Sequence, residues 1–331
     1  MMKRLKAALN GLSGVGGDYL DALRADDQFE LVAVGDGDRD VLRRCAGGLS
    51  ARAFEDHRSL VVESAHEGID VLFVAAEPFQ SREFVELALS RGIAVFHKAP
   101  PARTADDAMR LADAADRGRC PMIVQRNWAF DPALTRLHRL EETAGRVHAI
   151  HAEVRSADRP EGWRADAAKA GGGVLLNGAY EIVDLIVSLC GTARSVFARR
   201  GRGAFPELSP KYDTEDAAHL SLTLTGGAIG CVTAVRGAPN PGWRVTFDGD
   251  LAAVTLSDKG LRITPRDGDR EEFVPMPAGN RAASAIGAFG AARLAGVRDL
   301  PSTIRHHLPA LAVMDAAYLS AKTGVPEAPV E

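Results

Sequence analysis

The stretch AALNGLSGVGGDYLDAL, Ala7–Leu23, decides the fold, because it joins an apolar strand to an amphipathic helix through a glycine-rich turn. A dinucleotide-binding fold needs glycine here so that the turn is tight, the pyrophosphate approaches bare backbone, and the helix packs closely on the strand. The GxGxxG pattern is written here as GxSxxG, with serine at the second glycine position. We therefore predict that the cofactor is bound by Gly11, Ser13, Gly14, Val15 and Gly16.

An acidic residue follows at the spacing that such a fold requires. Asp36 ends the second predicted strand, 20 residues beyond Gly16, where its carboxylate would accept hydrogen bonds from the adenosine ribose. Asp36 and Asp38 would repel a 2′-phosphate, which favours NAD over NADP; Arg39 would soften that preference, so NADP stays as the alternative cofactor. The competing interpretation is that the glycines only form a turn in an α/β domain that binds no nucleotide.

The first 125 residues alternate short apolar runs with amphipathic segments, which predicts a doubly wound parallel sheet. Alanine and leucine recur at helical spacing in Ser81–Gly92 and Thr104–Gly118. The predicted strands are Lys6–Asn10, Phe29–Gly35, Asp70–Ala76, Ile93–His97 and Met122–Gln125.

After Pro132 the pattern changes to one helix followed by longer alternating strands, which suit an antiparallel sheet with one covered face. The expected helix is Ala133–Thr143, and the tail Thr303–Thr323 returns to a helical period. The expected strands are Val147–Arg155, His219–Thr225, Ala228–Val235 and Trp243–Gly249. We therefore predict a cofactor domain over residues 1–125 and a domain for substrate binding and oligomerisation over residues 126–331.

Composition excludes several classes of protein. A content of 46% hydrophobic residues is typical of a globular protein, and a length of 331 residues exceeds the usual size of a domain with one hydrophobic core. The net charge is -4 and the basic residues are scattered, so nucleic acid and membranes are not expected partners. Four separated cysteines predict neither a zinc site nor disulfides. No signal peptide or membrane span is evident, so we expect a cytoplasmic protein that binds a small molecule.

The chain resembles the glucose-fructose oxidoreductase, inositol dehydrogenase and rhizopine catabolism (Gfo/Idh/MocA) family over nearly its whole length. The resemblance rests on the turn above and on IDVLFVAAEP, GIAVFHKAPPART, GWRADAAKAGGGVLLNGAYEIVDLIVSLCG and AVMDAAYLSAKTG. It implies an α/β protein, with an N-terminal Rossmann domain and a C-terminal α+β domain that has an open, mainly antiparallel sheet. Members commonly form dimers or tetramers through that sheet, and their last helix, here about 303–323, usually packs back on the first domain.

The resemblance also implies chemistry. Members mostly oxidise a secondary alcohol of a sugar or cyclitol, or reduce the ketone, with NAD or NADP and no metal. A Glu-Lys-Pro motif supplies a lysine that touches both the nicotinamide ribose and the reacting hydroxyl. A second motif, GGG…D-x-G-x-H-x-x-D, supplies an acid/base histidine or, in some branches, tyrosine.

The first motif is altered in this chain. Aligned without a gap, Lys98 lies at the glutamate, Ala99 at the lysine and Pro100 at the proline. A one-residue insertion would instead place His97 and Lys98 at the Glu-Lys positions and leave Ala99 as the misfit. Lys98 is thus the candidate for catalysis, cofactor contact and substrate contact. The alternatives for Lys98 are a surface lysine or a lysine that replaces the family glutamate near the ribose. The alternative for His97 is a strand-end histidine with satisfied hydrogen bonds.

The second motif is altered at its acid/base position, where Glu181 replaces histidine and Tyr180 stands one residue earlier. Alcohol oxidation needs a proton acceptor that titrates near the working pH. Glu181 would serve if it were buried beside the cofactor, where its pKa would rise. Tyr180 would serve if a nearby Lys98 ammonium stabilised its phenolate. The predicted catalytic residues are Lys98, Tyr180 and Glu181, and the alternative for Glu181 is a carboxylate that only stabilises the dipole at the start of its helix.

The remaining site predictions follow from the same alignment. Asp184 lies three residues after Glu181, on the same side of the helix, and Asn177 matches the first aspartate of the motif. The predicted substrate residues are Lys98, Asn177, Glu181 and Asp184. Trp163 and Arg164 resemble a pair near the nicotinamide pocket of some members, with core packing as the alternative; Ala75 and Ala76 complete the expected cofactor site. The loop Arg202–Asp213 is expected to choose the substrate.

Two other functions fit the altered motifs. One is an enzyme that keeps its nicotinamide bound and uses transient oxidation for elimination or glycoside cleavage. The other is a binding protein that kept the cofactor pocket and lost the acid/base pair.

Overall fold

A computed structural model describes residues 3–130, 132–208, 212–268, 270–276, 279–297 and 300–330. The chain forms two compact units. The first unit combines Met1–Ala102, Asp106–Asp131 and Gly279–His306, and the second combines Arg103–Ala105, Pro132–Ala278 and His307–Glu331.

The first unit contains a six-stranded parallel sheet in the order β3-β2-β1-β4-β5-β6, which is the strand order of the Rossmann fold. Its strands are β1 (Leu5–Asn10), β2 (Phe29–Gly35), β3 (Arg52–Phe54), β4 (Val71–Val74), β5 (Ala94–His97) and β6 (Met122–Val124). Its helices are α1 (Val15–Ala25), α2 (Arg39–Ala46), α3 (His57–His66), α4 (Pro78–Ser90), α5 (Ala105–Gly118), α6 (Asn127–Phe130) and α10 (Arg281–Leu294). Every residue of β4 and β5 is buried, as expected for strands covered on both faces. The predicted parallel sheet is confirmed.

Aromatic side chains fill the core of the first unit. The Phe73 ring centroid lies 5.3 Å from that of Phe29 and 5.5 Å from that of Phe96. Phe289, from α10, lies 5.4 Å from Phe96. Because α10 also packs on α1, a segment close to the C-terminus completes the core of the N-terminal fold.

The second unit is built on an eight-stranded sheet in the order β14-β13-β12-β11-β7-β10-β9-β8. Its neighbouring strands are antiparallel except for the parallel pair β7 and β10, so the predicted mainly antiparallel sheet is confirmed. The strands are β7 (Val147–Ser156), β8 (Ala193–Gly201), β9 (Ala217–Leu224), β10 (Ile229–Arg236), β11 (Gly242–Gly249), β12 (Ala252–Ser257), β13 (Gly260–Pro265) and β14 (Glu272–Pro275). Burial alternates strictly along β9 and β12, because one face of the sheet is covered by helices.

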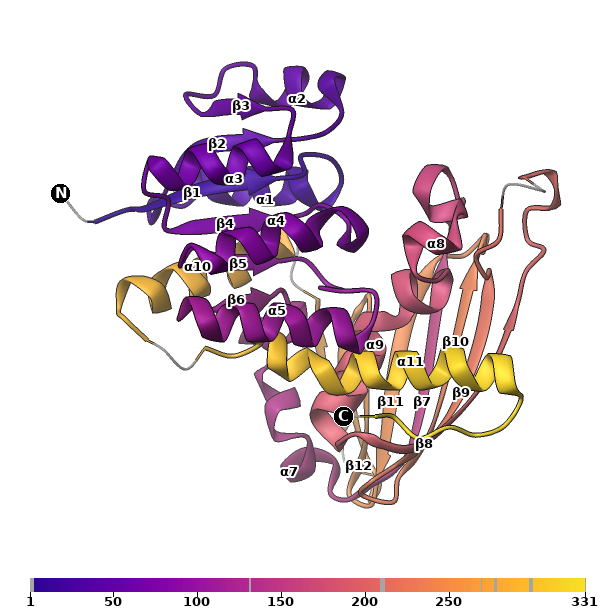
Figure 1. The fold of residues 1–331 in the computed structure, drawn as a ribbon. Helices are drawn as coiled ribbons and strands as arrows, with labels where there is room; N and C mark the ends of the chain where they lie inside the picture. The colour runs from indigo at the N-terminus through magenta and orange to yellow at the C-terminus, as the bar shows by residue number, and fades with distance from the viewer. Residues whose placement is uncertain are drawn as a thin grey trace. The chain divides into compact units, whose positions relative to one another are not determined.

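Two helices cover this sheet. Helix α9 (Val174–Cys190) packs on β7, β9 and β10, and α11 (Leu308–Thr323) packs on β8 and on α9 (Figure 1). By length and composition Ala167–Cys190 would pass as a membrane span, but 67% of its apolar window is buried inside the protein. Its contacts with the sheet identify α9 as a core helix.

The structure corrects one helix prediction and confirms another in more detail. The helix expected over Ala133–Thr143 is a 3-10 helix, Pro132–Arg139, followed by the short α7, Leu140–Ala144. The tail begins as a 3-10 turn, Ile304–His307, and becomes α-helical where proline occupies the first turn of α11, the position that proline favours in a helix.

Helix α11 belongs to the second unit, where it lies against β8 and α9. Helix α10, which the sequence did not predict, belongs to the first unit.

Candidate active site

The glycine turn after β1 is packed so tightly that no side chain fits at two of its positions. Gly11 has φ +85°, and a Cβ there would lie 2.7 Å from the Ala76 nitrogen. A Cβ on Gly16 would lie 2.1 Å from the Gly11 oxygen. At Gly14, which precedes α1, a Cβ would meet only open space. The N-terminus of α1 therefore presents bare backbone, which fits the pyrophosphate of a dinucleotide.

The carboxylate of Asp36 ties this turn to the end of β2. Its Oδ2 accepts a hydrogen bond from the Leu12 backbone N–H at 2.8 Å, and its Oδ1 accepts one from Asp38 N–H at 2.9 Å. Each carboxylate oxygen keeps a second lone pair that a ribose hydroxyl can use. Arg39 is paired with Glu55 at 2.7 Å, so its guanidinium is already engaged. These residues fit NAD.

A lysine and a glutamate form an ion pair at the same edge of the sheet. Lys98 directly follows β5, and its Nζ lies 2.6 Å from Oε1 of Glu77. Glu77 directly precedes α4, and the two side chains are 13% and 17% exposed. The reading of Lys98 as a surface lysine is therefore wrong.

Glu77 was missed by sequence reasoning, although a signal for it exists. Strands β4 and β5 are parallel neighbours, so the residues that follow them meet at one edge of the sheet. Glu77 lies three residues after β4 and Lys98 one residue after β5. Opposite charges in these two loops predict an ion pair where doubly wound sheets bind their ligands.

His97 is a core residue that does not face a ligand site. It is fully buried, with Nδ1 2.6 Å from the Lys98 carbonyl oxygen and Nε2 3.0 Å from the Ser81 hydroxyl. The carbonyl accepts from Nδ1–H, so Nε2 accepts from the serine. Burial lowers the pKa of this imidazole to about 4.

We expect His97 to make the folded protein sensitive to mild acid. The unfolded chain protonates this histidine below about pH 6.5, whereas the folded protein does so only near pH 4. Its contribution is fully present above pH 6.5 and is lost as pH falls from 6.5 towards 4, by at most about 3 kcal/mol. Urea unfolding across this range should show the loss, and a His97→Gln variant should show a flatter profile. Identical pH profiles for both proteins would contradict the assignment.

The N-terminus of α9 is held by Glu215, a residue that the sequence did not single out. Its side chain is 3% exposed. Its Oε1 accepts from the Gly173 and Leu175 backbone N–H groups at 2.7 and 3.1 Å and from the Tyr318 hydroxyl at 2.9 Å. Burial, and then the charge of Glu215, raise the pKa of Tyr318 far above its usual range.

The three glycines before α9 let Glu215 and Tyr318 approach the backbone at the start of this helix. A Cβ on Gly172 would lie 1.8 Å from the Tyr318 hydroxyl oxygen, and one on Gly173 would lie 2.1 Å from the backbone carbonyl oxygen of Glu215. Asn177, one turn into the helix, donates from Nδ2 to the Gly172 and Gly173 carbonyls at 2.9 and 3.3 Å.

Tyr180 points into the core of the second unit. It is 1% exposed, and its hydroxyl lies 2.9 Å from Nδ1 of His307. Oδ1 of Asp184 lies 3.3 Å from the same nitrogen. Lys98 and Tyr180 thus each have a close partner within their own unit, Glu77 and His307.

Glu181 has surroundings different from those predicted. It is exposed, whereas Asp184 is 2% exposed. Glu181 therefore lacks the burial that was predicted for it. Asp184, three residues later on the same helix, is on the buried side of the boundary between the exposed and the covered face.

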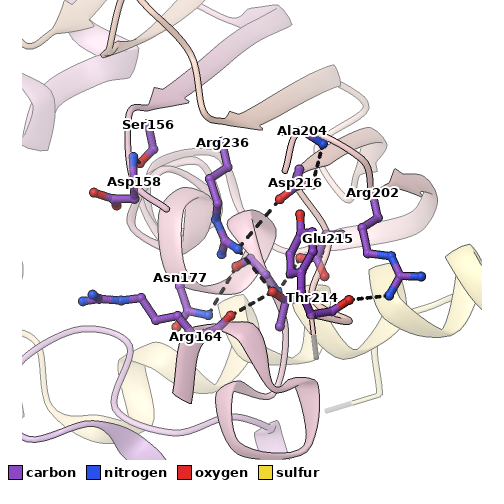
Figure 2. A network of polar contacts seen from close by, with 12 residues as sticks. Ser156, Asp158, Arg164, Asn177, Arg202, Ala204, Thr214, Glu215, Asp216 and Arg236 are labelled. Carbon is purple, nitrogen blue, oxygen red and sulfur yellow. Dashed lines mark hydrogen bonds and ion pairs between the residues drawn. The ribbon is translucent and has the colours of Figure 1, made fainter. Parts of the chain in front are cut away.

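Trp163 and Arg164 lie in a short 3-10 helix, Gly162–Ala165. The Arg164 guanidinium carbon is 5.0 Å from the centre of the Trp163 ring, a cation–π distance. The Arg164 carbonyl accepts a hydrogen bond from the Thr214 hydroxyl at 2.8 Å. This bond joins the 3-10 helix to a polar network around Arg236, whose members Figure 2 shows.

The expected substrate loop takes part in the same network. Arg202 donates from Nη1 to the Tyr212 carbonyl at 2.7 Å, and residues 209–211 of the loop lie outside the described residues. The sequence did not predict Thr214, Asp216 or Arg236. The only signal was an acidic run, DTED, before one strand and an arginine at the end of the next.

The strand order, the bare helix N-terminus and the acid after β2 define a dinucleotide-binding protein. Residues 5–126 match the model for an oxidoreductase family with an NAD-binding Rossmann fold, and residues 140–255 match the model for the GFO/IDH/MocA C-terminal domain. The chain belongs to the GFO/IDH/MocA family of oxidoreductases. The family, the NAD-binding class and the oxidoreductase class predicted from sequence are confirmed.

Several proteins of known activity are similar to this chain. D-apiose dehydrogenase of Paraburkholderia graminis is 28% identical over 98% of this chain and 89% of its own length. Levoglucosan dehydrogenase in complex with NADH and levoglucosan has the same fold, with a TM-score of 0.87 at 19% identity over 99% of this chain and 100% of its own. An enzyme of gentamicin A biosynthesis solved with NAD has a TM-score of 0.85 at 22% identity, over 100% and 98% of the two chains.

Proposed function

We propose that this protein transfers a hydride between NAD and a secondary alcohol or ketone of a small sugar-like or cyclitol-like substrate. Residues 1–125 would bind the cofactor and residues 126–331 the substrate. The observation that carries the proposal is the Lys98–Glu77 ion pair, an ammonium group held at the ligand-binding edge of a dinucleotide-binding sheet. The family and the sugar dehydrogenases similar to this chain support the substrate class.

Lys98 would handle the proton of the reacting hydroxyl. Its Nζ donates to the substrate oxygen and stabilises the alkoxide charge that develops there. Nζ first passes one of its protons to Oε1 of Glu77, 2.6 Å away, and the neutral amine then accepts the hydroxyl proton. The bound NAD would supply the hydride acceptor. This relay needs no residue at the family lysine position, which Ala99 occupies.

The second unit would contribute contacts to the substrate. Glu181 is exposed in the second turn of α9, and Asn177 lies one turn before it. We propose that both contact substrate hydroxyls. Tyr180 and Asp184, bound to His307 in the core, would hold this turn of the helix in place.

The experiment that tests the proposal is NADH formation from a panel of polyols, which includes D-apiose, levoglucosan and L-sorbose. We expect net NADH in proportion to substrate consumed, a lower kcat/KM for Glu181→Gln, and an unchanged kcat for Tyr180→Phe. Substrate turnover without net NADH would instead identify a non-redox enzyme that retains its nicotinamide. NAD binding without any turnover would identify a binding protein.

We also propose a cytoplasmic location and a homodimer or homotetramer formed through the open face of the eight-stranded sheet. That face carries the exposed residues that alternate with buried ones along β9 and β10. Light scattering of the purified protein measures the number of subunits directly.

A further inference from the structure

Arg236 is a buried arginine that the proposed reaction does not use. It ends β10 and is 4% exposed. Its neighbour across the parallel pair with β7 is Ser156, the last residue of that strand. Thr214 and Asp216 precede β9 at the same end of the sheet, close to the N-terminus of α9. Arg236 therefore belongs to the end of the second unit that carries Asn177 (Figure 2).

The guanidinium of Arg236 is sparsely bonded for a buried group. Among the residues that the structure describes, its side chain donates one hydrogen bond, from Nη1 to the Thr214 hydroxyl at 3.2 Å. Oδ1 of Asp216 lies 3.9 Å from Nη1, which is too far for a hydrogen bond. A guanidinium has five N–H donors, and leaving charged donors unpaired in a protein interior is costly.

One oxygen of each of the two nearest carboxylates, those of Asp216 and Glu215, is engaged by other groups. Oδ2 of Asp216 accepts from the backbone N–H groups of Gly203 and Ala204 at 2.9 and 3.0 Å. Oε1 of Glu215 accepts the three hydrogen bonds at the start of α9. Oδ1 of Asp216 and Oε2 of Glu215 are buried without a hydrogen-bond partner in the described part of the chain, and neither forms a hydrogen bond with Arg236. The protein itself thus leaves this cation incompletely paired.

Burial has the largest effect on Arg236 and lowers the pKa of its guanidinium. The charges of Asp216, Glu215 and Asp158 act in the opposite direction, and the charge of Arg164 has the smallest effect of these groups. A ligand that accepts hydrogen bonds from the guanidinium would offset part of the cost of burying it.

We propose that Arg236 binds a carboxylate of the substrate, which makes the substrate a polyhydroxylated acid such as a uronate, an aldonate or a cyclitol carboxylate. A carboxylate matches the planar fork of arginine with two parallel hydrogen bonds. The hydroxyl groups of the same molecule would remain for Asn177 and Glu181. This inference rests on the proposed function, because it names the substrate class of that site.

The rival interpretation is structural: Arg236 would only pin the segment before β9 through Thr214 and through its own backbone N–H, which donates to the Asp216 carbonyl at 2.7 Å. The backbone bond survives any substitution at residue 236. A purely structural arginine would also affect acidic and neutral substrates alike. The two interpretations therefore differ in substrate selectivity.

The test compares matched acids and neutral sugars, D-glucuronate with D-glucose and D-galacturonate with D-galactose. The variants are Arg236→Gln and Arg236→Lys. The lysine variant keeps the positive charge but loses the planar pair of N–H donors that binds a carboxylate with two hydrogen bonds. The control is Arg155→Gln. Arg155 precedes Ser156, the β7 residue paired with Arg236, and lies on the other face of the sheet. There it donates hydrogen bonds to Glu153 and to the Asn240 carbonyl. Both kcat/KM and the thermal shift caused by each sugar are measured.

We expect the wild-type protein and the Arg155→Gln control to favour the acids. Arg236→Gln should lower kcat/KM for acids by about 10- to 150-fold, the usual value of hydrogen bonds to a charged group, and leave the neutral sugars unchanged. The acids could raise the melting temperature of the wild-type protein but not that of Arg236→Gln, while no sugar gives NADH. This result would support the acid-binding site and refute the proposed redox function. A wild-type preference for the neutral sugars, equal losses for both classes, or no response to any acid would overturn the inference.

Discussion

Replacing Lys98 by methionine is expected to lower kcat by about 10²- to 10⁴-fold, the usual contribution of a positioned acid/base group. Methionine keeps the approximate length of the side chain and removes the ammonium group that can exchange a proton with Glu77. NAD affinity should change little, because the glycine turn and Asp36 carry the dinucleotide contacts. Stopped-flow NADH formation under saturating substrate measures kcat, and equilibrium titration measures NAD binding.

The control for this experiment is Lys6→Met, which removes an exposed lysine of β1 from the same unit. It should leave kcat unchanged. A Glu77→Gln variant separates the relay from simple charge stabilisation: it keeps the hydrogen bond to Nζ but cannot accept a proton, so kcat should fall and its pH profile should change. A fully active Lys98→Met protein would remove Lys98 from the mechanism and favour Glu181 as the base.

Replacing Glu215 by alanine is expected to destabilise the second unit by about 3–5 kcal/mol, the range for breaking a buried charged network. The variant leaves three donors without their acceptor, the N–H groups of Gly173 and Leu175 and the hydroxyl of Tyr318. Each unsatisfied buried donor costs about 1–3 kcal/mol. Denaturant unfolding, followed by tryptophan fluorescence and circular dichroism, measures the loss.

The matched control is Glu161→Ala, which removes a glutamate whose side chain is 74% exposed in the same unit. Its unfolding free energy should stay within about 0.5 kcal/mol of the wild type. If Glu215→Ala were equally mild, the N-terminus of α9 would be held by other contacts, and Glu215 would be free to act on a ligand.

The fold was predictable where local chemistry fixes it. The turn around Gly11 and Gly16 admits no side chain. Glycines at these positions therefore predict the backbone conformation of the turn. Helix α10 carried no such signal, because its place depends on Phe289 meeting Phe96 nearly two hundred residues earlier in the chain. Contacts between residues so far apart in the sequence depend on the packing of the whole core, and they produce no periodic pattern in the sequence.

The candidate site was predictable in part for a related reason. Lys98 was found because it lies in a motif, but its partner Glu77 comes from a different loop. Glu181 was expected to be buried, but it is exposed, whereas Tyr180, the residue directly before it on the helix, is buried. The direction of a side chain at the start of a helix depends on how that helix rests on its sheet, which spacing alone does not specify.

The return of α10 to the first unit has a consequence for the order in which the protein is made. The segments of the first unit are separated by nearly the whole second unit. When the ribosome has released the first 131 residues, Phe73 and Phe96 still lack Phe289, so this nascent core exposes aromatic surface. The nucleotide-binding half therefore begins synthesis first and completes its folding only after most of the other half has emerged.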